Sequence, residues 1–145
     1  MNKVKHIGIL NGPNMNLLGR REPMLYGTRS FDDYLCELRQ HFRDVELTYL
    51  QSNHEGVLID TLQDWGYRLD GIVLNAAAYT HTSIALRDTI AAIDVPVVEV
   101  HITDISGREP FRRNSLLSDV CTATIMGKGL AGYKEAIETL ITLTG

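Results

Sequence analysis

The sequence of 145 residues has only two cysteines, Cys36 and Cys121, and no Cys-x-x-Cys pair. A disulfide framework, a cysteine zinc site and a thioredoxin-type redox motif are therefore not indicated. Both cysteines are expected to be small buried apolar residues. Long apolar runs are missing as well: the one near the N-terminus, at about five residues, is too short for a signal-peptide core or a membrane span. We therefore expect a cytoplasmic protein with no membrane contact.

Positive charge is not in excess, because the formal net charge is -4, so binding to nucleic acid or to an anionic membrane is not expected. Repeats, low-complexity tracts and linkers are also missing, which indicates one domain over residues 1–145. Six of the ten arginines nevertheless lie in two loop-like stretches: Arg20, Arg21, Arg29, Arg108, Arg112 and Arg113. Because a guanidinium binds a carboxylate or phosphate with two hydrogen bonds, these clusters favour a small anionic ligand over ordinary surface charge.

Short segments rich in Val, Ile and Leu predict strands that are buried on both faces, as in a parallel sheet. They are 6–10, 71–75, 95–102 and 122–126, and a fifth segment, 45–51, alternates more and is expected at an edge. Helical periodicity is found at 30–42, 54–65, 83–93 and 130–143. This alternation predicts an α/β fold, a flavodoxin-like three-layer sandwich with a five-stranded parallel sheet of order 2-1-3-4-5.

Polar stretches follow three of the predicted strands. They read "NGPNMN" from residue 11, "NAAAYTHTS" from residue 75 and "EVHITD" from residue 99. In a sheet of this kind the ligand crevice lies outside the carboxyl ends of the strands, where the strand order reverses. The three stretches are therefore expected to meet in one site at that edge.

Glu99 and His101 lie two residues apart in a predicted strand, so their side chains share one face of the sheet. A carboxylate so placed holds a histidine in one tautomer and makes it a better general acid. The alternative is a pair of strand-end residues that face solvent. His81 is either a donor to a ligand hydroxyl or a solvated loop residue, and the amide of Asn75 either holds the next loop or binds a ligand.

The loop after the first strand is bracketed by Gly19 and Gly27, which are plausible hinges for a lid. Between them lie Arg20, Arg21 and Tyr26. A tyrosine beside an arginine can serve as a base, because the guanidinium stabilises the phenolate. The alternative is a tyrosine that only covers apolar surface when the loop closes.

The stretches "LNGPNMNLLGRREPMLYG", "LNAAAYTHTSIALRD", "VPVVEVHITD" and "REPFRRNS" closely resemble the type II 3-dehydroquinate dehydratases, in order and spacing, over essentially the whole chain. The resemblance implies a hydro-lyase that converts 3-dehydroquinate reversibly to 3-dehydroshikimate through an enolate. This reaction belongs to the shikimate pathway, which makes aromatic amino acids and chorismate, or to quinate catabolism. The resemblance also implies that there is no cofactor and no metal, and that trimers assemble into a homo-dodecamer.

The same resemblance implies a role for each matching residue. Tyr26 would take a proton from the carbon beside the ketone, with Arg21 holding its phenolate. Asn14 would steady the enolate through a water, and His101, oriented by Glu99, would protonate the departing hydroxyl. The substrate would be bound by Asn75, His81, Arg112 and the backbone amides of Ile102 and Thr103, and by Asp88 of a neighbouring subunit.

Three positions depart from the usual pattern of that family. Ala77 stands where glycine is common, Asp104 belongs to "HITD" in place of "HISN", and Asn114 stands where histidine is frequent. These departures are expected to affect substrate affinity more than reaction type.

Three other readings of the motifs stay open at this level. A flavin-binding domain is disfavoured, because "NGPNMN" lacks the hydroxyls and glycines of a phosphate cradle. A metal-dependent enzyme could use His81, Glu99 and His101 as ligands. A phospho-acceptor receiver domain is disfavoured, because no acidic pair follows the first strand.

Overall fold

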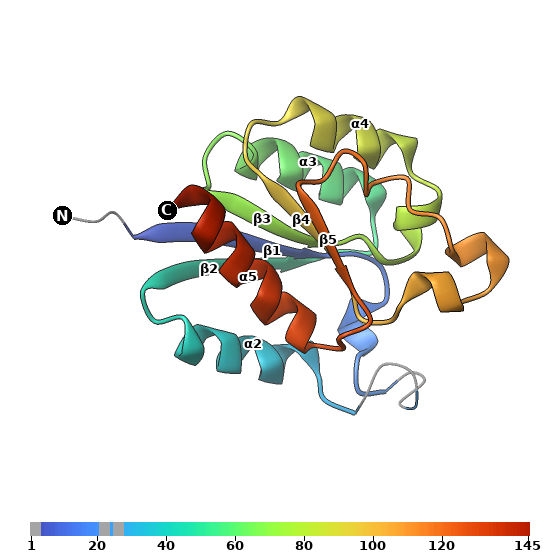
Figure 1. Cartoon of the computed structure of the whole chain (residues 1–145), viewed down its shortest axis with the longest axis horizontal. Coiled ribbons are helices and arrows are strands. Elements are labelled where there is room, and N and C mark those ends of the chain that lie inside the picture. The colour runs from blue at the N-terminus through green and yellow to red at the C-terminus, as the bar shows by residue number, and fades with distance from the viewer. Residues whose placement is uncertain (1–3, 21–23, 25–27) are drawn as a thin grey trace.

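The computed structural model describes residues 4–20, 24 and 28–145. Within these residues, five parallel strands form one sheet of order β2-β1-β3-β4-β5, as the sequence predicts (Figure 1). The strands are β1 (Lys5–Asn11), β2 (Val45–Gln51), β3 (Gly71–Asn75), β4 (Val97–His101) and β5 (Ala123–Met126). The prediction that 45–51 is an edge strand is confirmed. β4 is shorter than predicted at its start because Pro96 has no N–H to give to a neighbouring strand.

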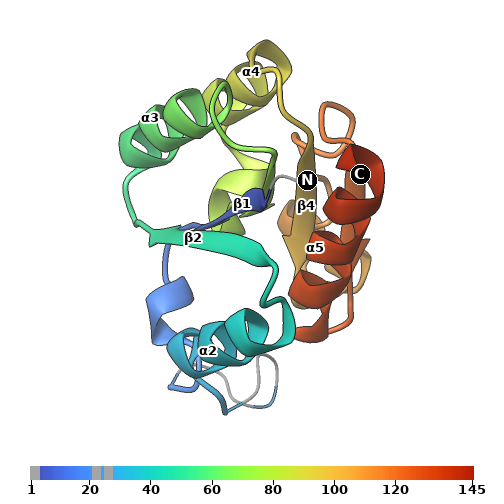
Figure 2. The ribbon, with the colours of Figure 1, turned by 90° about the vertical axis from the view of Figure 1, so that its left-hand side faces the viewer.

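Helices cover both faces of the sheet, which confirms the three-layer prediction (Figures 1 and 2). They are α2 (Phe31–His41), α3 (Glu55–Trp65), α4 (Ile84–Ala92) and α5 (Ala131–Thr144). α2 and α5 lie on one face, and α3 and α4 lie on the other. The predicted N-cap of α2 is present, since the Ser30 hydroxyl accepts a hydrogen bond from the Asp33 amide at 3.2 Å.

The period-two pattern of the buried strands divides the core into two clusters. Ile9 and Val73 point to the face covered by α2 and α5, whereas Leu10 and Leu74 point to α3 and α4. The same alternation places the polar residues at the strand ends. Asn11 and Asn75 are in register with the residues that point to α2 and α5, and Glu99 is in register with those that point to α3 and α4.

The prediction for Cys36 is wrong. Its side chain is exposed on α2, between the buried positions Leu35 and Leu38. Cys121 is partly buried, and burial, together with the charges of Glu99 and Asp119, raises the pKa of its thiol to about 12. This thiol therefore stays protonated at neutral pH and is not a nucleophile.

Among the described residues, no helix has both the length and the apolar character needed to cross a membrane.

Gly12 brings the first loop against the η2 turn (Ala77–His81). Its amide donates to the Asn75 carbonyl at 2.7 Å, and a Cβ at this position would lie 2.5 Å from the Ala76 carbonyl oxygen. Gly12→Ala is therefore expected to cost about 2 kcal/mol in the free energy of unfolding, measured by urea denaturation. Gly56→Ala on α3 is the control, because a Cβ there meets nothing within 4 Å and should stabilise the helix. Equal stability of the two variants would contradict this account.

Candidate active site

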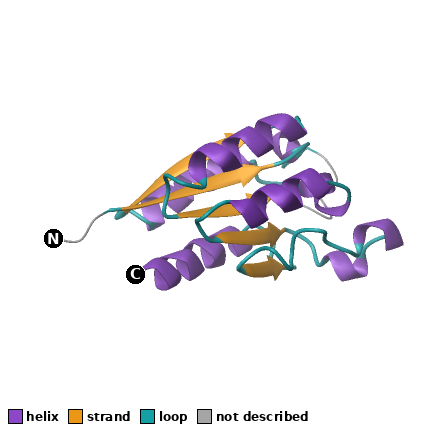
Figure 3. Ribbon diagram, turned by 90° about the horizontal axis from the view of Figure 1, so that it is seen from above, coloured by secondary structure: helices purple, strands orange, loops and turns teal. Residues whose placement is uncertain are grey.

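A pocket of about 100 Å³ lies at the carboxyl edge of the sheet. In Figure 3 this edge is the one toward which the strand arrows point. It is lined by Pro13, Asn14, Met15, Asn75, Ala77, Ala78, His81, His101, Ile102, Thr103, Ile105, Arg108 and Arg112. These residues come from the last positions of β3 and β4 and from the loops after β1, β3 and β4. The structure thus brings the three polar stretches together, as the switch-point rule predicts.

Glu99 and His101 project from β4 on the same face, and Nε2 of His101 lies 2.5 Å from Oε2 of Glu99. Glu99 is 0% exposed and His101 is 6% exposed. The alternative of two residues facing solvent is therefore wrong. Within the described residues no hydrogen bond engages Nδ1 of His101, which makes Nδ1 the ring nitrogen left for a ligand in the pocket.

Three hydroxyls also hold the buried carboxylate of Glu99, and sequence reasoning missed them. Ser115, Ser118 and Thr124 donate to it at 2.7, 2.6 and 3.0 Å. Burial alone would raise the pKa of Glu99, but the hydrogen bond and charge of His101 and the two serine hydroxyls outweigh burial and lower that pKa. Glu99 therefore remains ionised at neutral pH and can orient its histidine.

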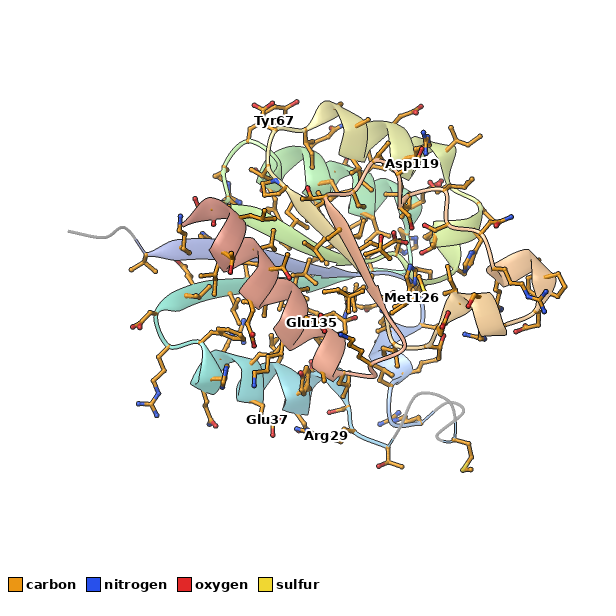
Figure 4. The ribbon with its side chains drawn as sticks, in the orientation of Figure 1. Arg29, Glu37, Tyr67, Asp119, Met126 and Glu135 are labelled. Carbon is orange, nitrogen blue, oxygen red and sulfur yellow. The ribbon has the colours of Figure 1, made fainter. Side chains whose placement is uncertain are left out.

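The segment that carries the two serines is clamped to α4. Arg87 donates to the Leu116 carbonyl at 2.9 Å and to Asp119 Oδ2 at 2.8 Å. Asp119 lies beside α4 (Figure 4). These contacts help to hold the loop that carries the serine hydroxyls beside the buried strand residue Glu99.

In the folded protein the pKa of Glu99 is lowered from its ordinary value of 4.5. Its ionised carboxylate therefore stabilises the fold at pH values above 4.5, and this stabilisation is lost as the pH falls through the lowered pKa. Glu99→Gln is expected to lose about 3 kcal/mol in the free energy of unfolding at neutral pH, since it breaks a buried pair. Its stability should also fall less steeply than that of the wild type below pH 4.5. Urea denaturation across this range measures both effects, and an unchanged pH dependence would contradict the assignment.

His81 lies in the η2 turn, and its Nδ1 is 2.8 Å from the backbone carbonyl of Asn114. A carbonyl only accepts, so Nδ1 carries a proton and Nε2 of the neutral ring is left as an acceptor. The contact uses the backbone of Asn114, which explains how this position tolerates an asparagine where histidine is frequent. His81 is thus oriented by the protein and is not a freely solvated loop residue.

The second arginine stretch contributes Arg108 and Arg112 to the pocket. Glu109 lies between them: Oε2 is 3.1 Å from Nε of Arg112 and Oε1 is 3.4 Å from Nε of Arg108. Arg108 also donates to the Thr103 hydroxyl at 3.3 Å. Sequence reasoning placed Arg108 in the cluster but did not propose it as a site residue. Arg113 does not line the pocket, since it is exposed and donates to the Arg108 carbonyl.

The first arginine stretch is used differently. Arg29 pairs with Glu37 at 3.0 Å on the outer side of α2 (Figure 4). Arg29 lines a larger hollow of about 790 Å³, which meets the first pocket at Ile102 and Thr103. Arg21, Tyr26 and Gly27 lie outside the described residues.

Asn14 and the backbone at residues 102–103 complete the pocket. Asn14 has a φ of 69°, in the left-handed region that asparagine tolerates. Its backbone N–H donates to Oδ1 of Asn53 at 3.0 Å. Within the described part of the chain, the backbone N–H groups of Ile102 and Thr103 donate no hydrogen bond, which leaves them for a ligand anion. The departure at Asp104 is structural, because its carboxylate accepts from the amide and hydroxyl of Ser106 at the start of η3 (Ile105–Gly107).

Asp88 is exposed on α4 and does not line the pocket of its own chain. That Asp88 reaches the site of a neighbouring subunit stays a prediction.

The metal-site alternative finds no support in the side chains. In residues 4–20, 24 and 28–145, no group of three or more His, Cys, Asp or Glu side chains is arranged to hold a metal ion. His81 and His101 are each bonded to a different partner.

Comparison with known proteins identifies the relatives of this chain. The dehydroquinase class II family model matches residues 5–141. A 3-dehydroquinate dehydratase from an Exiguobacterium species is 55% identical over 134 residues, covering 92% of each chain. One from Bacillus pumilus is 49% identical over 142 residues, covering 97% of each. The crystal structure of a type II dehydroquinase from Butyrivibrio crossotus superposes with a TM-score of 0.92 at 40% identity, covering 94% of this chain and 97% of that one.

Proposed function

This chain belongs to the dehydroquinase class II family, and from that premise we propose that its pocket removes water from 3-dehydroquinate to give 3-dehydroshikimate. The protein is then a hydro-lyase of the shikimate pathway or of quinate breakdown. The observation that supports this most is the buried Glu99–His101 pair in a pocket that is also lined by Arg112, Ile102 and Thr103. The backbone N–H groups of Ile102 and Thr103 donate no hydrogen bond to any residue that the structure describes. Together they supply a proton donor and a binding site for a carboxylate.

The chemistry needs one base and one acid. A base removes a proton from the carbon beside the ketone, and the electron pair of that C–H bond becomes the enolate. The enolate then expels the hydroxyl from the next carbon, and His101 gives that oxygen a proton, so that water leaves and a conjugated enone forms. Glu99 holds Nε2 of His101 and stabilises the imidazolium before the transfer.

The remaining roles follow the resemblance residue by residue. Tyr26 is the base and Arg21 holds its phenolate, although both lie outside the described residues. Asn14, at the mouth of the pocket, steadies the enolate. The substrate is bound by Asn75, His81, Arg112 and the amides of Ile102 and Thr103, with Asp88 from a neighbouring subunit.

The test is to mix the purified protein with 3-dehydroquinate and follow the absorbance of the enone. We expect turnover that survives a strong chelator and a protein that is colourless in the visible range. Loss of activity on chelation would support the metal alternative, and a bound chromophore would support the flavin alternative. No turnover in a folded sample would refute the proposal.

We further propose that the chain works in the cytoplasm as a homo-dodecamer built from trimers, which rests on the family resemblance. In light scattering, the particle mass is expected to be twelve times the chain mass of 16.2 kDa. Asp88→Ala should then lower activity although Asp88 lies outside the pocket of its own chain. A fully active monomer would refute both the dodecamer and the role of Asp88 in a neighbouring subunit.

A further inference from the structure

A chain of buried hydrogen bonds runs beneath the carboxyl edge of the sheet, from η2 to β2. The Ala77 amide donates to Oδ1 of Asn75 at 3.0 Å, and Nδ2 of Asn75 donates to the Tyr133 hydroxyl at 3.0 Å. That hydroxyl donates to Oδ1 of Asn11 at 2.7 Å, and Nδ2 of Asn11 donates to the Tyr49 hydroxyl at 3.4 Å. The chain thus links five elements, η2, β3, α5, β1 and β2, through the amide side chains of Asn75 and Asn11.

The direction of this chain follows from its first member. A backbone N–H can only donate, so the atom of Asn75 that faces Ala77 is the oxygen, and Nδ2 faces Tyr133. The single hydroxyl proton of Tyr133 is then directed at Asn11. Burial raises the pKa of Tyr133 well above its ordinary value, so its hydroxyl keeps this proton at neutral pH.

This arrangement leaves Asn75 with one weakly bonded donor. Its oxygen is taken by Ala77, and one of its two amide hydrogens is taken by Tyr133. The second hydrogen faces Sδ of Met15 at 3.7 Å, and a thioether is a weak acceptor. Both Asn75 and Met15 line the pocket, so an oxygen atom of a ligand can replace the sulfur as the partner.

We propose that Tyr133 is a positioning residue that holds the Asn75 amide so that it presents a single N–H donor to the ligand. Tyr133 is completely buried and is not among the residues that line the pocket. The ligand group opposite Asn75 must then be an acceptor, such as a carboxylate or hydroxyl oxygen, and a donor-only group such as an ammonium is excluded. The identity of that ligand as 3-dehydroquinate rests on the proposed function.

Tyr133→Phe tests this, with Tyr49→Phe as a matched control. Both variants remove one hydroxyl from the same chain of hydrogen bonds, but only the first removes a partner of Asn75. Both keep a ring that packs on Phe31, at 4.8 and 4.9 Å between ring centroids. We expect Tyr133→Phe to raise KM about tenfold with kcat changed less than about twofold, and Tyr49→Phe to change neither by more than about twofold. The kinetic constants of both variants are measured under conditions in which their circular dichroism spectra match that of the wild type.

A double variant separates positioning from general loosening. If Tyr133 acts through Asn75, adding Tyr133→Phe to Asn75→Ala should change KM by less than about twofold. Full additivity, or equal KM values for the two tyrosine variants, would overturn the proposal.

A second measurement does not depend on turnover. The side-chain amide protons of Asn75, assigned by their loss in Asn75→Ala, can be followed by NMR. Tyr133→Phe is expected to speed their exchange with water about tenfold, and Tyr49→Phe is not. Equal exchange in the two variants would overturn the positioning role even if the dehydratase activity is present. An inactive wild type with the expected exchange would instead refute only the proposed function.

Discussion

His101→Ala is expected to lower the rate of dehydration about a thousandfold, while hydrogen exchange at the carbon beside the ketone continues. In the proposed mechanism the two half-reactions use different groups, so removing the acid should stop the departure of the hydroxyl but not the formation of the enolate. Two observations support the proposed role of His101 as the donor: its Nε2 is bonded to a buried carboxylate, and His101 lines the pocket. The enone absorbance measures dehydration, and NMR in deuterium oxide measures exchange.

His41→Ala is the control for this experiment, because His41 is exposed on α2 and does not line the pocket. It should retain the wild-type rates of both steps. If hydrogen exchange also stops in His101→Ala, then His101 takes part in proton removal and the division of labour proposed here is wrong.

Tyr26→Phe is expected to abolish both dehydration and hydrogen exchange, a loss of about a thousandfold or more, with the fold and ligand binding retained. The phenol of tyrosine titrates near pH 10, so a base at neutral pH requires about 4 kcal/mol of phenolate stabilisation. A guanidinium about 4 Å away at an effective dielectric constant near 20 supplies that amount. Arg21 suits this task because it stays protonated itself.

The competing base within the described residues is His81, whose Nε2 is left as an acceptor by the bond to Asn114. Hydrogen exchange distinguishes the two. Tyr26→Phe should stop exchange, whereas His81→Ala should raise KM and leave exchange at saturating substrate within about tenfold of the wild type. The opposite result would transfer the role of base to His81. Tyr67→Phe is the control for loss of a phenol, since Tyr67 is 63% exposed and does not line the pocket.

Much of the fold was predictable from local patterns. The buried strand at 71–75 and the edge strand at 45–51 were predicted at the bounds that the structure shows, because continuous or alternating apolar residues report burial directly. The pairing of Glu99 with His101 was predictable for the same reason, since period two puts both on one face of β4. Cys36 was mispredicted because helical phase, and not residue type, decides which side of α2 is buried.

The partners of the pocket residues were not predictable in this way. Ser115 and Ser118 reach Glu99 from a loop segment that Arg87 ties to α4, far from Glu99 along the chain. Tyr133 looks like an ordinary core residue of α5, and nothing in its neighbourhood along the chain indicates that its hydroxyl meets Asn75.

The sequence by itself determined the order of strands and helices, the edge of the sheet where the polar loops gather, and the residue types available for catalysis. All of these depend on periodicity and turn chemistry within a few neighbouring residues. Only the tertiary structure decided which nitrogen of His81 and of His101 is left for a ligand, how the amide of Asn75 is oriented, and that Asp88 lies away from its own pocket. Those features depend on hydrogen-bond partners that come from distant elements, and the direction of such a bond exists only once both partners are in place.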